Sequence, residues 1–378
     1  MLSFKVIGCG AAGNKAVVDL ANSGYDKDRL VLLNSTNKDI PENADIKTII
    51  FGNGLGGCGK ERKLGKKMLL SSIKSNTIYD GMVDPTDQGI VLVGSTEGGS
   101  GSASIPILAK YFKDVHGANV TCVLFFGFQD DTRGLQNSIE ICQELSEEYN
   151  VIAISNAKFL NECNGNKFKA ERMANQYFCK IMKILTGQVI NPGPQVIDDT
   201  DLYKIVTTPG YMMADSTTFK SFKNIEEFNS KLKEFVTYHK FIDTPNNAGM
   251  KREALIFTTF EDDDNIDYSA KVIDDLYGTP YEKFTNVAHQ DKAGSIFFAY
   301  IMSGMKLPVT ELTDIYNKYI ESSKKVDKTE DSFMDTVTSM RGNAEDDQFN
   351  VMGRKKNKQL SKESFFGSFG IDNDEEEY

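Results

Sequence analysis

Gly94-Ser95-Thr96-Glu97-Gly98-Gly99-Ser100-Gly101-Ser102 is the stretch of sequence that decides the fold. It directly follows the apolar run Ile90–Val93 and precedes Ile105-Pro106-Ile107-Leu108-Ala109. We therefore expect a buried strand that ends in a glycine-rich loop and continues into a helix. Glycines let backbone approach a ligand closely, and a helix N-terminus offers unpaired N–H donors. The stretch predicts a phosphate-binding loop, made of Glu97, Gly98, Gly99, Ser100, Gly101 and Ser102.

Length and composition favour a soluble cytoplasmic protein that has either two domains or one large core with an appendage. The chain has 378 residues, of which 40% are hydrophobic and 26% are charged. It lacks an apolar run of about 18 residues, which predicts no membrane span, and it begins in a strand-like segment rather than a signal peptide. The six cysteines form no C-x-x-C pair and only three histidines occur, so we expect neither disulfides nor a metal site built by the protein alone. A net charge of −11 disfavours direct DNA binding by the folded body.

Short apolar runs alternate with helical patterns over the first half of the chain. Such strands, separated by helices, predict a mostly parallel sheet covered on both faces, an α/β fold of the Rossmann type. Their loops share the carboxyl edge of the sheet, where such folds bind ligands. The expected strands are Phe4–Ile7, Leu30–Leu33, Thr48–Phe51, Ile90–Val93, Val120–Phe126 and Val151–Ile154.

The remaining segments complete the expected domain organisation. A helix buried on several sides is expected within 167–190, after a nucleotide-binding domain over 1–166. An α+β domain is expected over 191–325, with an amphipathic helix carrying Phe219, Phe222, Ile225, Phe228, Leu232 and Phe235, and with strands Ala254–Phe260 and Ser295–Met302. A further helix is expected over 326–340. The tail 341–378 has a basic cluster, isolated aromatics and an acidic end, and we expect it to be disordered.

A second glycine-rich loop directly follows the first strand. Gly8-Cys9-Gly10-Ala11-Ala12-Gly13-Asn14 satisfies G-x-G-x-x-G in the strand-to-helix context of a dinucleotide site. That interpretation requires an acidic residue near the end of the second strand, to hold the ribose hydroxyls. The strand ends instead in Asn34-Ser35-Thr36, and Asp39 comes late. An NAD(P)-dependent oxidoreductase therefore remains only an alternative.

A third loop, Gly52-Asn53-Gly54-Leu55-Gly56-Gly57-Cys58-Gly59-Lys60-Glu61, follows the third strand. It contains G-x-x-x-x-G-K, but Glu61 stands where a P-loop has Ser or Thr. The motif is therefore no Walker motif, although Lys60 and Arg62 could still face phosphates. One such loop is readily explained as a tight turn. Three loops at three strand ends of one sheet predict a pocket that wraps a chain of phosphates.

These loops resemble those of the tubulin/FtsZ superfamily. Glu97–Ser102 is similar to the signature G-G-G-T/S-G-T/S-G, and Gly8–Asn14 to the first nucleotide loop. Gly56–Arg62 is most similar to the phage and plasmid TubZ branch. The resemblance implies that GTP or GDP, with Mg²⁺, binds to residues of all three loops. From the first and third loops these are Gly10, Ala11, Ala12, Gly13, Asn14, Gly57, Cys58 and Lys60.

The resemblance extends to the ribose, the base and the catalytic loop. Phe126–Arg133 has the F-x-F-E-x-x-x-R spacing of the ribose loop, with Gln129 in place of Glu, so either Gln129 or Asp130 is expected to hold the ribose beside Arg133. Asn156 matches the residue that contacts guanine, and Met173-Ala174-Asn175-Gln176 resembles A-A-N-D, which places Asn175 and Gln176 near the base. Val196–Leu202 resembles the catalytic loop N-x-D-x-x-D-V, with Asp198 and Asp201 at the carboxylate positions and Val196 where Asn is usual.

The resemblance implies a filament-forming GTPase whose active site is completed by the next subunit. A loop at the opposite end of the central helix would reach the neighbour's nucleotide in a head-to-tail homopolymer. The TubZ-like loop favours segregation or positioning of plasmid or phage DNA, with a DNA-binding adaptor on the tail. A phage-spindle filament of the PhuZ type, a polymer that does not hydrolyse nucleotide, and a tail that serves solubility alone are alternatives. The tail lacks the D-I-P-x-F-L-type peptide of cell-division FtsZ.

Overall fold

A computed structural model describes residues 1–41, 45–52, 56–145, 148–244, 247–260, 263–290, 294–323 and 359–369. One ten-stranded sheet runs through the molecule in the order β3-β2-β1-β4-β5-β6-β7-β10-β8-β9. The strands are β1 Phe4–Cys9, β2 Leu30–Asn34, β3 Lys47–Ile50, β4 Gly89–Ser95, β5 Val120–Phe126, β6 Asn150–Ser155, β7 Gly210–Lys220, β8 Arg252–Thr259, β9 Glu282–His289 and β10 Ser295–Met305.

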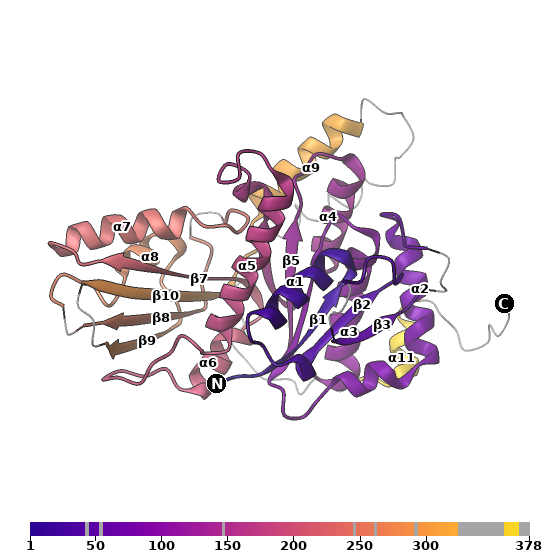
Figure 1. Ribbon diagram of the computed structural model, residues 1–378, viewed down its shortest axis with the longest axis horizontal. Coiled ribbons are helices and arrows are strands. Elements are labelled where there is room, and N and C mark those ends of the chain that lie inside the picture. Colours follow the sequence, from indigo (N-terminus) through magenta and orange to yellow (C-terminus); the bar gives the residue numbers. More distant parts are fainter. Residues whose placement is uncertain are drawn as a thin grey trace.

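Helices pack against this sheet, and α5 crosses it between the strands β1–β6 and the strands β7–β10 (Figure 1). Among the described residues, none of the helices has both the length and the apolarity that a bilayer crossing demands. The α-helices are α1 Gly10–Asn22, α2 Arg62–Ser75, α3 Gly99–His116, α4 Thr132–Glu144, α5 Lys167–Leu185, α6 Asp199–Val206, α7 Ile225–Thr237, α8 Lys271–Tyr277, α9 Val309–Ser323 and α11 Lys362–Gly367. Short 3₁₀ turns are η1 Lys27–Arg29, η2 Thr77–Met82 and η3 Asn156–Phe159.

The six expected strands of the first half are confirmed, and they are parallel. β1, β4 and β5 are buried along nearly their whole length because helices cover both faces, which is why they read as continuous apolar runs. All of them point the same way, so the loops after β1, β4, β5 and β6 meet at one carboxyl edge. The α/β fold therefore confirms the sequence prediction, and the loops that the sequence predicts to bind a ligand share this edge.

Two parts of the second half differ from the sequence prediction. Phe219 lies in β7 and Phe222 in the following turn, and α7 begins only at Ile225, where Asn224 caps it by accepting from the N–H of Glu227 at 2.9 Å. Phe219 still packs against Phe235 of α7, with ring centroids 6.0 Å apart, so the aromatic pattern reflects shared burial rather than one helix. The α+β unit also shares the main sheet, because β6 pairs with β7 at Asn150–Gly210 and Val151–Tyr211.

The C-terminal segment also differs from its prediction in part. Most of 324–378, including the helix expected at 326–340, lies outside the described residues. Residues 359–369 are described, however, and form α11 against α3. Phe365 is 0% and Phe366 is 4% exposed, and the Phe365 ring meets that of Tyr111 edge-on at 5.1 Å. The aromatics of this segment are therefore buried on the folded body, which a composition argument could not detect.

Candidate functional site

The glycine-rich stretch forms the turn between β4 and α3. Gly98 is extended and α3 begins at Gly99, so the first backbone N–H groups of the helix have no carbonyl partner within it. A Cβ on Gly101 would lie 2.7 Å from the carbonyl oxygen of Cys9, and one on Gly10 would lie 2.8 Å from the amide nitrogen of Gly101. The first two loops thus pack backbone to backbone, which requires glycine at both positions. The hydroxyl of Ser102 turns inward and donates to the carbonyl of Gly98.

The first loop contributes the first turns of α1, which hold Gly10, Ala11, Ala12, Gly13 and Asn14. Gly13 faces the sheet, because a Cβ there would lie 2.1 Å from the carbonyl oxygen of Val93. Asn14 is 0% exposed and its Oδ1 accepts from the N–H of Leu33 at 3.2 Å. Its Nδ2 is buried and finds no acceptor among the described residues. Such a donor would be satisfied by a ligand that enters beside α1.

The third loop meets the other two through Gly57, Cys58 and Lys60. A Cβ on Gly57 would lie 3.8 Å from the hydroxyl of Ser35, and that hydroxyl lies 2.7 Å from the hydroxyl of Ser100 at the start of α3. Cys58 is 3% exposed. A Cβ on Gly99 would lie 2.9 Å from the amide nitrogen of Lys60. The three loops therefore surround the start of α3, as the sequence predicts, although residues 53–55 lie outside the described part.

Ion pairs of both polarities join the third loop to the start of α4. Lys60 pairs with Asp131 at 2.6 Å, and Arg133 with Glu61 at 2.9 Å. The amide of Asn137 donates to the carbonyl oxygens of Lys60 and Glu97 at 3.0 and 2.9 Å, so one side chain joins the third loop to the signature loop. The electrostatic surroundings of the phosphate loops are thus mixed rather than uniformly basic.

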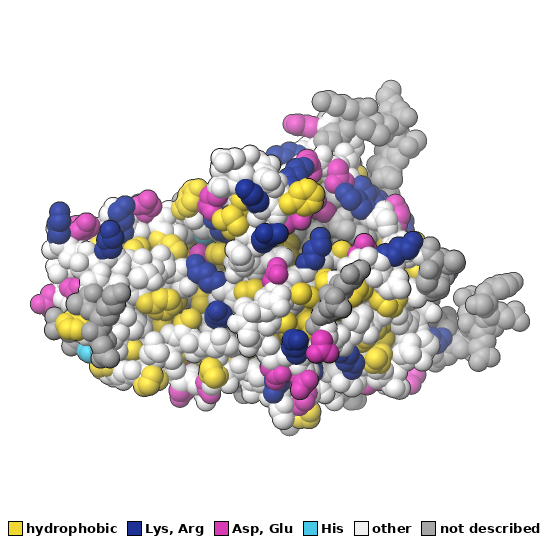
Figure 2. Space-filling view, in the orientation of Figure 1, with side chains coloured by type: hydrophobic (Ala, Val, Ile, Leu, Met, Phe, Trp, Pro, Cys, Tyr) yellow, Lys and Arg dark blue, Asp and Glu magenta, His cyan; other side chains and the backbone are white. Residues whose placement is uncertain are grey.

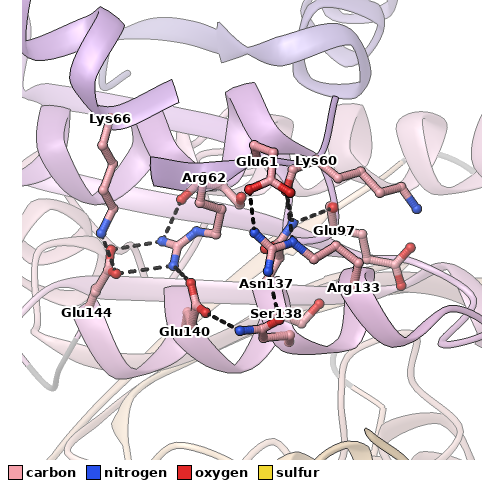
Figure 3. A network of polar contacts seen from close by, with 12 residues as sticks. Lys60, Glu61, Arg62, Lys66, Glu97, Arg133, Asn137, Ser138, Glu140 and Glu144 are labelled. Carbon is pink, nitrogen blue, oxygen red and sulfur yellow. Dashed lines mark hydrogen bonds and ion pairs between the residues drawn. The ribbon is translucent and has the colours of Figure 1, made fainter. Parts of the chain in front are cut away.

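Arg62 does not face the pocket, contrary to the sequence expectation. Its side chain is 2% exposed and pairs with Glu140 at 2.7 Å and with Glu144 at 2.8 Å. It also donates to the carbonyl of Ser102 at 3.0 Å. Figure 3 shows Arg62 and Lys66 on one helix pointing toward the two glutamates on the other. Arg62 thus fixes α2 against α3 and α4, which positions the loop without contacting its contents.

The ribose loop follows β5. Gln129 has a φ of 58°, and its Oε1 accepts from the Nζ of Lys318 on α9 at 2.9 Å. Asp130 forms an ion pair with Lys167 at the start of α5. Both side chains that the sequence offered for the ribose are therefore engaged with neighbouring helices.

The residues expected near the base lie on η3 and α5. Asn156 is 9% exposed, and its Oδ1 is buried without a partner in the described part of the chain. Asn175 instead donates to Asp19 of α1 at 2.8 Å and so joins the two helices, while Gln176 is exposed. A purine base carries both hydrogen-bond donors and hydrogen-bond acceptors on its edge. The Oδ1 of Asn156 and the Nδ2 of Asn14 offer one acceptor and one donor that would match them.

The two candidate catalytic carboxylates lie at the start of α6. Asp198 caps this helix by accepting from the N–H of Asp201 at 2.8 Å, and Asp201 lies 3.6 Å from the Nζ of Lys204. The preceding loop is fixed by Asn286 of β9, which is 0% exposed, accepts from the N–H of Ile197 and donates to the carbonyl of Asn191. The side chain of Asn286 thus fixes the backbone of this loop on both sides of the exposed Val196.

α6 lies at the end of the sheet opposite the glycine-rich loops. Asn119, just before β5, donates to the hydroxyl of Tyr203 on α6 at 2.6 Å, which places this helix at the amino edge of the parallel strands. Figure 1 shows α6 at one end of α5 beside the start of β1. A cavity of about 500 Å³ opens here, lined among others by Asp84, Gln88 and Asp199. Within one molecule, the carboxylates and the glycine-rich loops are therefore separate.

Sequence reasoning missed Ser35, just after β2, and Asn286 of β9, which support the site from outside its motifs. Both are buried polar residues, and only the fold shows which loop they face. Sequence reasoning also treated Glu97 as an ordinary member of the glycine-rich signature, although Glu97 places a carboxylate where the signature has glycine. This difference from the signature is visible in the sequence, and it is the signal that sets Glu97 apart from the other residues of the loop.

Residues 3–164 match the family model described as "Tubulin/FtsZ family, GTPase domain". Two curated proteins of Methanocaldococcus jannaschii are similar to this chain. Cell division protein FtsZ 1 is 22% identical over 213 residues, which cover 55% of this chain and 57% of that protein. Cell division protein FtsZ 2 is 25% identical over 213 residues, 55% of each chain. The chain thus matches little more than half the length of these relatives.

Solved structures show a similar fold over most of the chain. The GTPγS-bound protofilament of CetZ2 from Haloferax volcanii has a TM-score of 0.67 at 17% identity, covering 86% of this chain and 100% of that chain. A GTPγS-form protofilament of TubZ from Bacillus thuringiensis serovar israelensis has a TM-score of 0.67 at 13% identity, covering 86% and 93%. TubZ of Clostridium botulinum phage c-st has a TM-score of 0.66 at 16% identity, covering 86% and 98%.

Proposed function

We propose that this chain binds GTP, hydrolyses it and assembles head to tail into filaments, because residues 3–164 match the family model of tubulin/FtsZ GTPase domains. The observation that carries the proposal is the separation of the two halves of the site. The glycine-rich loops lie at the carboxyl edge of the sheet, and Asp198 and Asp201 lie at the start of α6, at the amino edge. α5 spans about 28 Å between them, at about 1.5 Å per residue over its 19 residues.

The loop residues would hold the nucleotide. Backbone N–H groups at the start of α3, beside those of Gly10 and Gly57, suit the phosphates. Asn14 and Asn156 would pair with the base through their unsatisfied amide atoms. Mg²⁺ bound with the phosphates would offset their charge, because it usually takes one or two carboxylates plus phosphate oxygens. Within the described residues, no group of three or more His, Cys, Asp or Glu side chains could hold a metal ion by itself.

Hydrolysis would require a second molecule. In a head-to-tail contact, the amino edge of one subunit covers the carboxyl edge of the next, so Asp198 and Asp201 would orient and polarise the attacking water. The cavity beside Asp199 gives the amino edge a concave surface, and Phe168, 84% exposed at the start of α5, gives the opposite edge an apolar contact. Free subunits would then hydrolyse slowly, and hydrolysis within the filament would govern disassembly.

Light scattering with GTP tests this function. We expect scattering to rise when GTP is added to the purified chain and to decay as phosphate is released. GTPγS, which is hydrolysed slowly, should give a rise without the decay. A chain that binds NADH and shows no assembly with GTP would contradict the proposal and favour the oxidoreductase alternative.

We further propose that the filament segregates or positions plasmid or phage DNA through an adaptor bound to the C-terminal tail. On the face shown in Figure 2, Lys and Arg side chains lie among Asp and Glu rather than in one basic surface. Together with the net charge of −11, this favours indirect DNA binding. The adaptor would recognise the basic cluster Arg354-Lys355-Lys356-Asn357-Lys358, whose structure lies outside the described residues.

Charge reversal of this cluster tests the cargo role while leaving α11 in place. Arg354, Lys355, Lys356 and Lys358 are replaced by Glu, and filaments are imaged in cells together with the replicon that encodes the chain. We expect filaments that form normally and no longer follow the DNA. Unchanged colocalisation, or purified filaments that shift bare DNA in a gel, would contradict the adaptor proposal.

A further inference from the structure

Glu97 places a carboxylate inside the phosphate-binding stretch, at the first position of the signature, where the resembling sequences have glycine. The same chain has Gln129 in the ribose loop, where those sequences have glutamate. One carboxylate is thus absent from the usual place, and another is present on the neighbouring loop. The contacts of these residues show how the two departures are related.

The Glu97 side chain lies against the ribose loop, between two glycines. A Cβ on Gly127 would lie 2.1 Å from its Oε2, and a Cβ on Gly134 would lie 3.1 Å from its Cδ. Its Oε1 accepts from the backbone N–H of Gln129 at 3.3 Å. The carboxylate of Glu97 therefore reaches the backbone of residue 129 itself. Figure 3 shows Glu97 and Lys60 extending to the same side, away from Glu140 and Glu144.

The other polar side chains of the ribose loop are occupied by protein partners. Gln129 accepts from Lys318, and Asp130 pairs with Lys167. Asp131 caps α4 by accepting from the N–H of Gly134 at 2.7 Å and pairs with Lys60 at 2.6 Å. Glu97, by contrast, forms no ion pair within the part of the chain that the structure describes. It is thus the carboxylate of this region that retains the capacity to accept hydrogen bonds.

We propose that Glu97, rather than Gln129 or Asp130, accepts hydrogen bonds from the ribose hydroxyls of the bound nucleotide. This inference rests on the proposed GTP binding and deepens it. A carboxylate accepts from two neighbouring hydroxyl groups, as in other nucleotide folds where an acidic residue holds the ribose. Burial, with smaller contributions from Asp131 and Asp130, raises the pKa of Glu97 despite the N–H of Gln129 and Lys60. Hydroxyl donors would relieve that cost in the complex.

Titration with GTP and with 2′,3′-dideoxy-GTP tests this assignment. The dideoxy compound lacks both hydroxyls and keeps the base and the phosphates. We expect the unaltered chain to bind it about 10- to 100-fold more weakly than GTP, the range for hydrogen bonds to a charged group. Glu97→Gln should weaken GTP binding and leave dideoxy-GTP binding nearly unchanged, so that the discrimination largely disappears. Gln129→Ala and Asp130→Asn are matched controls that should retain it.

The alternatives give different results. If Glu97 only supports the loop through the N–H of Gln129, Glu97→Gln weakens both nucleotides equally, which overturns the assignment. If Glu97 acts through Mg²⁺, the loss is again equal for both nucleotides and disappears when Mg²⁺ is omitted, which also overturns it. If Asp130→Asn abolishes the preference for GTP over dideoxy-GTP, the residue that accepts from the ribose hydroxyls is Asp130 and not Glu97. An unaltered chain that binds neither nucleotide would instead refute the proposed function.

Discussion

Arg62 of α2 donates from Nη2 to Oε2 of Glu144 on α4 at 2.8 Å, although the two residues are 82 positions apart in the sequence. Arg62 is 2% exposed, whereas Glu140 and Glu144 are each 31% exposed, so a buried cation faces carboxylates that reach solvent. The pair closes the side of the third loop opposite the pocket. The loop that we propose to contact the phosphates is thereby held in place on its other side.

Replacing Arg62 with Met should destabilise the fold. Removing one partner of a fully buried ion pair costs about 3–5 kcal/mol, and the half-exposed glutamates can rehydrate, so we expect about 2–3 kcal/mol. Chemical denaturation followed by circular dichroism measures the change. Lys66→Met is the matched control on the same helix, because Lys66 is 30% exposed and its pair with Glu144 should contribute less than about 1 kcal/mol. Equal effects of the two substitutions would contradict a special role for Arg62.

Asp198→Asn and Asp201→Asn should slow GTP hydrolysis by about 10²–10⁴-fold and leave nucleotide binding and polymerisation intact. Asn is chosen because it retains the helix cap that Asp198 provides, so any loss reflects the carboxylate and not the stability of α6. Phosphate release and sedimentation, measured on the same samples, separate the two effects. Normal turnover in both variants would refute the assignment and leave a polymer without this catalytic loop.

Glu253 and His239 should give opposite pH dependences of stability. Burial raises the pKa of Glu253 from 4.5 to about 7 despite its pair with Lys283 at 2.8 Å. Its contribution to stability is therefore complete below pH 4.5 and is lost as the pH rises toward 7. Burial, with Lys158 and Lys240, lowers the pKa of His239 from 6.5 to about 4, against Asp243 and the backbone of Phe241. That contribution is complete above pH 6.5 and is lost as the pH falls toward 4.

Single substitutions separate these two contributions. In Glu253→Gln, the contribution of His239 remains and that of Glu253 is removed. The free energy of unfolding should therefore rise with pH between about 4 and 6.5, by up to about 3 kcal/mol at 1.36 kcal/mol per pKa unit. In His239→Gln it should fall with pH between about 4.5 and 7 by a similar amount. Urea denaturation at half-unit pH intervals measures both slopes. The same slope in both variants would show that other groups govern the pH dependence.

Phe365→Ala should release α11 from α3. The lost ring contacts Tyr111, Phe366 and Phe369, so the helix would lose the centre of its aromatic packing, and truncation of a buried Phe costs about 3–5 kcal/mol. A helix of six residues cannot persist alone. Hydrogen exchange at α11 and at the adjoining end of α3 should accelerate, while β1 and β4 remain protected. Lys362→Ala removes the ion pair with Asp80 at 3.0 Å and the ammonium group 5.7 Å from the centre of the Tyr111 ring, but it leaves the aromatic packing of α11 in place, so it should have a smaller effect. Unchanged exchange in Phe365→Ala would show that the docking does not depend on this ring.

The sequence predicts the strands of the first half well, because each is an apolar run that ends at a glycine or polar loop. β7 and β9 were missed for a physical reason. The buried part of β7, Gly210–Ser216, includes the polar residues Asp215 and Ser216, so its apolar run is short, and residues 282–285 of β9 are half-buried without alternation. The meeting of the three phosphate loops also followed from strand order. The partners of Lys60, Asp130 and Gln129 did not, because each is an ion pair or hydrogen bond to a residue more than 35 positions away.

The docking of α11 on α3 differs from contacts between molecules in its dependence on protein concentration. The filament growth proposed above would require encounters between molecules and would therefore depend on the protein concentration. α11 is part of the same polypeptide as α3, so its local concentration near Tyr111 is set by the tether and does not change on dilution. A partner that binds this face of α3 must displace α11, which is always present because it is part of the same chain. The affinity measured for such a partner would be weakened by the same factor at every protein concentration.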